Sequence, residues 1–154
     1  MKQILLLAAA LAAIPLTAAW AQSAAPAGGL TPEQIVAARQ SAYMLSGGSF
    51  AAMKAAAEAG ADVKQLVIPS RALARWARTL PGLFPAGTDL STSKALPAIW
   101  SDRAGFEARA AAYADAARLM AEAAQTGDRA AFLARWAEAR ATCAACHDGY
   151  RRSD

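Results

Sequence analysis

Hydrophobic residues between positions 102 and 127 recur at alternating intervals of four and three. This spacing places them on one face of an α-helix, as in the seam between helices that pack nearly parallel or antiparallel. Asp102 precedes the pattern as a candidate N-cap, and Gly127 follows it as a candidate helix end. The pattern predicts one long helix with a seam made of Phe106, Ala110, Tyr113, Ala117, Met120 and Ala124.

Three more helices are predicted on either side of this one. The stretch TPEQ, beginning at Thr31, has the residues of a capping box and begins a helix from Pro32 to about Ala59. A second helix is expected from Pro69 to near Leu80, because proline suits the start of a helix, and a fourth from about Arg129 to Arg152. The first helix has a predicted face of Ile35, Ala38, Ala42, Leu45 and Ser49. The second has Leu73, Trp76, Ala77 and Leu80, and the fourth has Phe132, Trp136, Ala139, Cys143, His147 and Tyr150.

These four helices, with no alternating strand pattern between them, predict an all-α fold, a four-helix bundle. Residues 81–99 hold three prolines and form a long loop, a kind of segment that is often functional. Gly47 and Gly48 mark either a break in the first helix or a close approach by another backbone or a flat ligand. Because alanine dominates the inner positions, the core is thin and has room for something bulky.

The N-terminus is typical of an exported protein. Lys2 precedes an apolar run from Ile4 to Ile14, and small residues flank a predicted cleavage after Ala21. The run is short for a membrane anchor, which is the alternative interpretation, and no basic cluster follows it. Residues 1–21 are therefore predicted to be a cleaved signal peptide, residues 22–30 a flexible lead-in, and residues 31–154 the folded domain.

The net charge of the chain adds little to the predicted function. Removal of 21 of the 154 residues takes away one lysine, so 15 basic and 12 acidic residues remain. A mild, scattered positive balance of this kind does not indicate a nucleic-acid partner.

The chemistry is concentrated near the C-terminus, where Cys143, Cys146 and His147 form C-x-x-C-H. This is the attachment motif of c-type haem: two thiols one helical turn apart add to the haem vinyl groups, and the adjacent imidazole is an axial ligand of the iron. The predicted cofactor is one covalent haem c. Because His147 is the only histidine, the sixth position of the iron is left to methionine, another residue, water, a gas or nothing.

Three other interpretations of the motif compete with haem. A thioredoxin-like redox pair needs a βαβ setting, and no such pattern is visible. A zinc site would need a carboxylate as its fourth ligand, since the sequence has no further cysteine or histidine. A structural disulfide between Cys143 and Cys146 would close a very short loop and constrain little of the chain.

Several stretches together resemble the cytochrome c′ family, the class II c-type cytochromes. They are ARQSAYML, LPGLFPAGT, LPAIWSDRAGFEARAAAYADAA and TCAACHDGYRR, and they cover nearly all of the mature chain. The resemblance implies an antiparallel four-helix bundle with one covalent haem, usually a homodimer in the periplasm. It also implies a five-coordinate, high-spin haem that admits small ligands such as NO and CO.

The resemblance also implies roles for single residues. Arg39 and Gln40 match positions that contact the haem propionates, and Arg151 matches a basic position beside the proximal His147. Tyr43 matches the distal position, where low-spin members of the wider class have a methionine that binds the iron. Tyrosine there favours an open sixth site.

Two functions therefore stay open. One is a gas-binding haem protein with His147 proximal and Tyr43 distal. The other is an electron carrier, with a five-coordinate haem or with a methionine, Met44, as sixth ligand, although Met44 lies about 100° around the helix from Tyr43. In the second case a basic rim near Arg151 and Arg152 would guide an acidic redox partner. No acid–base constellation beyond the haem indicates an enzyme.

Overall fold

A computed structural model of the protein describes residues 29–153. The predicted signal peptide and most of the predicted lead-in lie outside this range. The described chain is helical, and its β pairing is confined to one isolated antiparallel bridge between Ala95 and Arg151. The elements are α1 (Pro32–Glu58), the 3₁₀ turn η1 (Val63–Leu66), α2 (Val67–Thr79), the 3₁₀ turn η2 (Leu80–Leu83), α3 (Ala98–Ser101), α4 (Arg103–Thr126) and α5 (Arg129–Tyr150).

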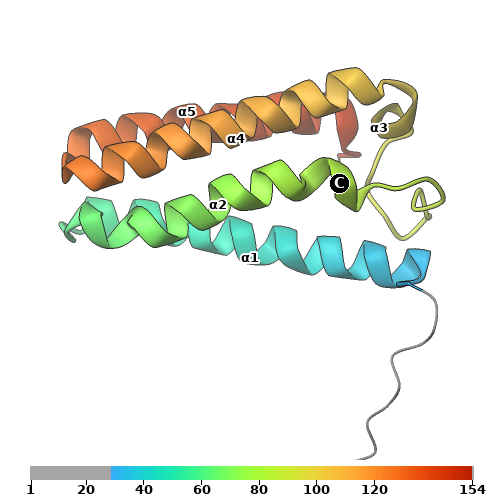
Figure 1. Ribbon diagram of the computed structural model, residues 1–154, viewed down its shortest axis with the longest axis horizontal. Coiled ribbons are helices and arrows are strands. Elements are labelled where there is room, and N and C mark those ends of the chain that lie inside the picture. Colours follow the sequence, from blue (N-terminus) through green and yellow to red (C-terminus); the bar gives the residue numbers. More distant parts are fainter. Residues whose placement is uncertain (1–28, 154) are drawn as a thin grey trace, which may run out of the picture.

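The four long helices α1, α2, α4 and α5 lie side by side, with successive helices running in opposite directions (Figure 1). This confirms the predicted antiparallel four-helix bundle. The loop between η2 and α4, which carries the short α3, covers one end of the bundle, while the α1–α2 and α4–α5 connections lie at the other. Among residues 29–153, no helix has the length and apolar character needed to cross a membrane.

The predicted caps are present. In the capping box of α1, the Thr31 hydroxyl accepts a hydrogen bond from the Gln34 N–H, and the Gln34 side chain accepts one from the Thr31 N–H. Asp102 caps α4 through the Gly105 N–H, and Gly127 ends it with a φ of 78°, a left-handed conformation that glycine adopts without steric cost. The α4 seam is buried as predicted, with Tyr113 only half-buried.

Two boundaries differ from the prediction. The second helix begins at Val67 rather than Pro69, and η1 precedes it; proline fits in the first turn because an N–H there has no partner within the helix. The last helix ends at Tyr150 rather than Arg152. Its final residues turn extended because the Arg152 N–H donates to the carbonyl of Lys94, and the Leu96 N–H donates to the carbonyl of Tyr150.

The predicted apolar face of the first helix is wrong. Leu45 is 76% exposed and Ala38 is exposed, whereas the buried residues of α1 are Val36, Arg39, Met53 and Ala57. The buried face lies to one side of the predicted one. Alanines of this helix are exposed (Ala38), half-buried (Ala42) or buried (Ala57), so alanine positions do not fix its orientation. Gly47 and Gly48 cause no break, since α1 is continuous through both.

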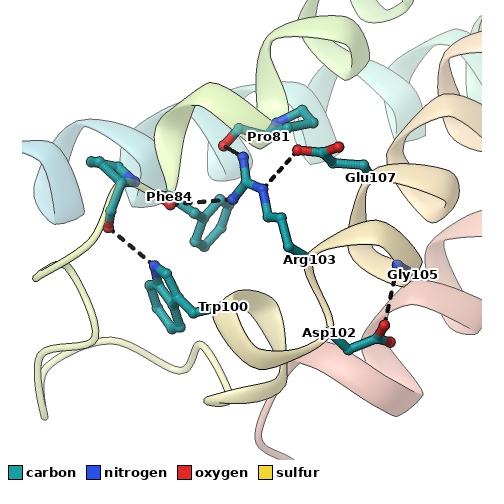
Figure 2. A network of polar contacts seen from close by, with 8 residues as sticks. Pro81, Phe84, Trp100, Asp102, Arg103, Gly105 and Glu107 are labelled. Carbon is teal, nitrogen blue, oxygen red and sulfur yellow. Dashed lines mark hydrogen bonds and ion pairs between the residues drawn. The ribbon is translucent and has the colours of Figure 1, made fainter.

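Arg103, at the start of α4, holds the beginning of the long loop (Figure 2). Its guanidinium donates to the carbonyl oxygens of Pro81 (2.7 Å) and Phe84 (3.3 Å) and to Glu107 (2.7 Å). The Trp100 indole N–H donates to the Pro85 carbonyl at 3.1 Å. These bonds bring the loop over the end of the bundle, where Phe84, Ile99, Phe106 and Tyr150 form a small apolar cluster.

Candidate haem-binding site

A cavity of about 670 Å³ lies between α1, α2, α4, α5 and the long loop. Its volume is within the range of roughly 300–1,000 Å³ that is typical of cofactor pockets. All seven predicted site residues line it: Arg39, Gln40, Tyr43, Cys143, Cys146, His147 and Arg151. The fold therefore brings the two halves of the predicted site, about a hundred positions apart in the sequence, to one place.

The two thiols lie three residues apart in the last turns of α5. Both are half-buried and free, and the Cys143 sulfur donates to the Ala139 carbonyl at 3.6 Å. Burial raises the pKa of each thiol, because the uncharged form is favoured away from water; the neighbouring Cys143 raises the pKa of Cys146 further. The spacing places both sulfurs on one side of the helix, facing the cavity.

His147 follows directly and also lines the cavity. Loss of water around the ring lowers its pKa, and the positive charge of Arg151 lowers it further, against the opposing effect of Asp148. The neutral imidazole, which is the form that binds iron, is therefore favoured. Among residues 29–153, no group of three or more His, Cys, Asp or Glu side chains could hold a metal ion, so the zinc interpretation finds no fourth ligand there.

Tyr43 reaches the cavity from α1. Its ring packs edge-on against Trp76 of α2, with 5.4 Å between ring centroids, and burial raises the pKa of its hydroxyl. Within the described part of the chain, none of the hydrogen bonds found involves this hydroxyl, so it is available to a ligand in the cavity. The neighbouring Met44 borders the same cavity, yet its side chain is 79% exposed.

Arg39 is buried, at 2% exposure, against the long loop. Its two terminal nitrogens donate to the Leu83 carbonyl (3.1 Å), the Thr88 hydroxyl (2.8 Å), the Thr88 carbonyl (2.7 Å) and the Ser93 hydroxyl (2.8 Å). The guanidinium also lies 4.2 Å from the centre of the Phe84 ring, and burial lowers its pKa. Arg39 thus fixes the loop wall of the cavity, and its contact with a propionate stays a prediction.

Gln40 and Arg151 lie at the exposed edge of the cavity. The Gln40 amide donates to the Thr92 carbonyl at 3.0 Å, so it also touches the loop. Arg151 is the C-cap of α5; its backbone N–H donates to the His147 carbonyl at 3.1 Å. Its side chain adds positive charge beside the imidazole.

The charges around the cavity fit haem. Its lining residues among positions 29–153 include the cations Arg39, Lys94, Arg109 and Arg151 and no carboxylate. The rest of the wall is largely aromatic and aliphatic. A flat apolar molecule with two carboxylates is electrostatically suited to such a cavity, and two thiols and an imidazole are the groups needed to attach it through its edge and iron.

Some lining residues were not among the predicted site residues. Trp76, Phe84 and Tyr113 line the cavity, and Thr88 and Ser93 fix Arg39. Trp76 and Tyr113 did belong to predicted apolar helix faces, but such a pattern does not distinguish core packing from contact with a cofactor. Ser93 and Thr88 lie in the loop that its length had marked as functional, although no periodic pattern identifies single loop residues.

Comparison with known proteins identifies the family. The family model described as cytochrome c′ matches residues 34–151, while the comparison with curated proteins finds no match. Solved structures do match: cytochrome c′ from Thermochromatium tepidum is 27% identical, with a TM-score of 0.75 over 82% of this chain and 100% of that one.

Two other solved structures are of similar closeness. A cytochrome c′ described by its unusual ligand-controlled dimer dissociation is 26% identical, with a TM-score of 0.76 over 82% of this chain and 100% of that one. A nitric oxide complex of a variant cytochrome c prime from Alcaligenes xylosoxidans is 31% identical, with a TM-score of 0.74 and the same coverages of 82% and 100%. With the fold, the cavity and the attachment motif in agreement, the chain belongs to the cytochrome c′ family and its cofactor is haem c.

Proposed function

We propose that this protein is an exported haem protein that binds small diatomic molecules such as NO and CO at a vacant sixth position of a five-coordinate iron. The observation that carries this proposal is the pair of residues on the two walls of the cavity, His147 on α5 and Tyr43 on α1. Haem, held by Cys143, Cys146 and His147, would supply an iron that can bind a diatomic molecule. The similar protein in complex with nitric oxide supports the same chemistry here.

In this proposal each of the cavity residues has a different role. Cys143 and Cys146 would hold the cofactor by two thioethers, and His147 would supply its neutral imidazole to the iron. Tyr43 covers the distal side, and its hydroxyl can donate a hydrogen bond to the ligand. Arg39 and Arg151 would supply positive charge on the side where the propionates are expected, and Gln40 and Arg151 would add N–H donors there.

Met44 is the alternative sixth ligand, and its exposure argues against that role. A ligand to the iron must point into the cavity, whereas Met44 is 79% exposed to solvent and Tyr43 is 36% exposed. Tyr43, one residue earlier, occupies the inward direction instead. The structure of α1 therefore supports the five-coordinate state.

Electron transfer is a second candidate, favoured by the exposed cations on the cavity's rim. Lys94, Arg109 and Arg151 border the cavity and are exposed. Such a rim would attract an acidic redox partner and increase its rate of association. A five-coordinate haem can carry out both functions.

We further propose that the protein works as a periplasmic homodimer. The predicted signal peptide supports export. Leu45 of α1 and Ile68 of α2 are large apolar residues with 76% and 79% exposure, and a second copy could cover them. The similar cytochrome c′ with ligand-controlled dimer dissociation supports this assembly.

Resonance Raman spectra of the haem-loaded protein in both oxidation states test the coordination, and addition of CO or NO tests the vacancy. We expect five-coordinate, high-spin spectra that change when the gas is added. Met44→Leu should leave the spectra of the free protein unchanged, whereas Tyr43→Met should convert them to six-coordinate and low-spin. A change in the Met44→Leu spectra toward high spin would instead identify Met44 as the sixth ligand.

A further inference from the structure

Gly47 forms part of the cavity wall, and nothing in the described structure requires glycine at this position. It lies within the continuous helix α1, and it is not one of the described glycines with positive φ, which are Gly60, Gly87 and Gly127. A Cβ atom built on Gly47 would meet no atom within 4 Å. Glycine in a helix interior costs roughly 1 kcal/mol relative to alanine, so neither strain nor close packing among residues 29–153 accounts for it.

The position of Gly47 relative to Tyr43 suggests a reason. The two residues are four apart, so they lie on the same side of α1, and both line the cavity. Side chains in a helix lean toward its N-terminus, and each covers the turn that precedes its own Cα. A side chain at position 47 would therefore extend toward Tyr43, into part of the cavity wall where no atom lies within 4 Å.

Two neighbours hold the Tyr43 ring, although the residue keeps 36% exposure. Trp76 packs edge-on against it from α2, and Arg39 lies one turn earlier on α1, fixed by four hydrogen bonds to the loop. Neither of these neighbours can move without loss of contacts. Over Gly47, no atom lies within 4 Å of the position that a Cβ would take, so no side chain there opposes movement of the ring.

We propose that Gly47 is a specificity-determining residue of the distal cavity, because its missing side chain leaves the space into which the Tyr43 ring moves when a diatomic ligand enters. This inference rests on the proposed function. It assigns to Gly47 the control of how large a ligand is accepted, since the space left by one absent side chain is small.

Gly48 provides a matched control. It is the next residue of the same helix, about 100° around the axis, and it is not among the residues that line the cavity. Its Cβ would likewise meet no atom within 4 Å. Alanine at either position removes one glycine from α1, so both variants lower the flexibility of the backbone equally, but only alanine at 47 fills the space beside Tyr43.

The experiment compares Gly47→Ala, Gly47→Val and Gly48→Ala with the unchanged chain, all loaded with haem. We expect Gly47→Ala and Gly48→Ala to raise the thermal midpoint by similar amounts, about 2–5 °C. The affinity of the ferrous protein for CO should fall on the order of tenfold in Gly47→Ala, because one extra methyl group in a small apolar space has an effect of this size. It should fall further in Gly47→Val and stay unchanged in Gly48→Ala.

Equal CO affinities in all four proteins would overturn the proposal. So would an equal fall in Gly47→Ala and Gly48→Ala, because that would make backbone flexibility the cause. If the unchanged chain binds neither CO nor NO, the proposed function itself fails and this inference fails with it. If the unchanged chain binds CO and only the Gly48 control differs from it, the proposed function stands and the role of Gly47 does not.

Discussion

The two ends of the bundle are built from the same helices but differ in what fills them. At the end with the short connections, large side chains from all four helices and η1 pack into one core, including Met53, Leu73, Met120 and Phe132. At the other end Tyr43, Gly47, Ala110 and Cys143 line a cavity. The site thus depends on where bulky residues are omitted as much as on the residues that bind.

Phe50 and Trp136 mark the boundary between the two ends. Their rings are stacked with 4.4 Å between centroids, and the Trp136 indole N–H donates to the Phe50 carbonyl at 2.9 Å. Phe50 lines the cavity on one side and packs against the apolar core on the other. This pair joins α1 to α5 where the apolar core ends, so packed side chains bound the cavity on that side.

The largest effect is expected from removal of the cofactor's attachment. Cys143→Ser with Cys146→Ser should abolish thioether formation, so that the mass of the protein equals that of the polypeptide alone. Because a bound cofactor stabilises the folded state, amide hydrogen exchange should accelerate around the cavity while helix segments at the packed end keep most of their protection. A uniform loss of protection along the chain would show that the two ends do not behave separately.

The packed end is tested by Phe132→Ala. This ring has no exposed surface, so its removal should lower the free energy of unfolding by about 3–5 kcal/mol, as measured by denaturant titration. Leu133→Ala, one residue along and only partly buried, serves as the control and should cost clearly less. The optical spectrum of the haem should be the same in both variants, and a changed spectrum after Phe132→Ala would contradict the independence of the cavity.

Arg39→Met tests the loop wall of the cavity. Methionine keeps an apolar chain of similar length but loses the four hydrogen bonds to the loop, and it leaves the buried Thr88 and Ser93 hydroxyls without this donor. We expect a loss of about 2–4 kcal/mol in the free energy of unfolding and faster proteolysis of residues 84–96. Gln40→Ala removes a single exposed bond to the same loop and should cost about 0.5 kcal/mol. Equal effects of the two variants would refute the role given to Arg39.

The smallest of these effects is expected from Gly105→Ala, in the first turn of α4 at the loop end of the bundle. A Cβ at this position would collide with the Asp102 carboxylate and the Tyr150 hydroxyl, which are hydrogen-bonded to each other at 2.7 Å. Overpacking of this kind costs about 1–3 kcal/mol, measurable by thermal unfolding. Gly149→Ala is the control: its Cβ would meet no atom within 4 Å, so the variant should be as stable as the original or slightly more so.

The sequence was most informative where its residues differ clearly in size and polarity. The seam of α4 has Phe106 and Met120 among its alanines, and Asp102 and Gly127 mark its ends, so the helix and its buried face could both be predicted. In α1 the polar Arg39 is buried while Leu45 is exposed, and alanines of this helix are found on its exposed as well as its buried side. The buried face of α1 could not be predicted because its orientation depends on a cavity and a loop formed by distant parts of the chain.

By itself the sequence determined the helices, the bundle and the chemistry of attachment, because caps, helical spacing and C-x-x-C-H are local patterns. Only the tertiary structure decided how α1 is oriented, that Arg39 holds the long loop, and that Gly47 and Tyr43 line one cavity with His147. These features arise from contacts between residues far apart in the chain, and local spacing does not encode the distances between such residues.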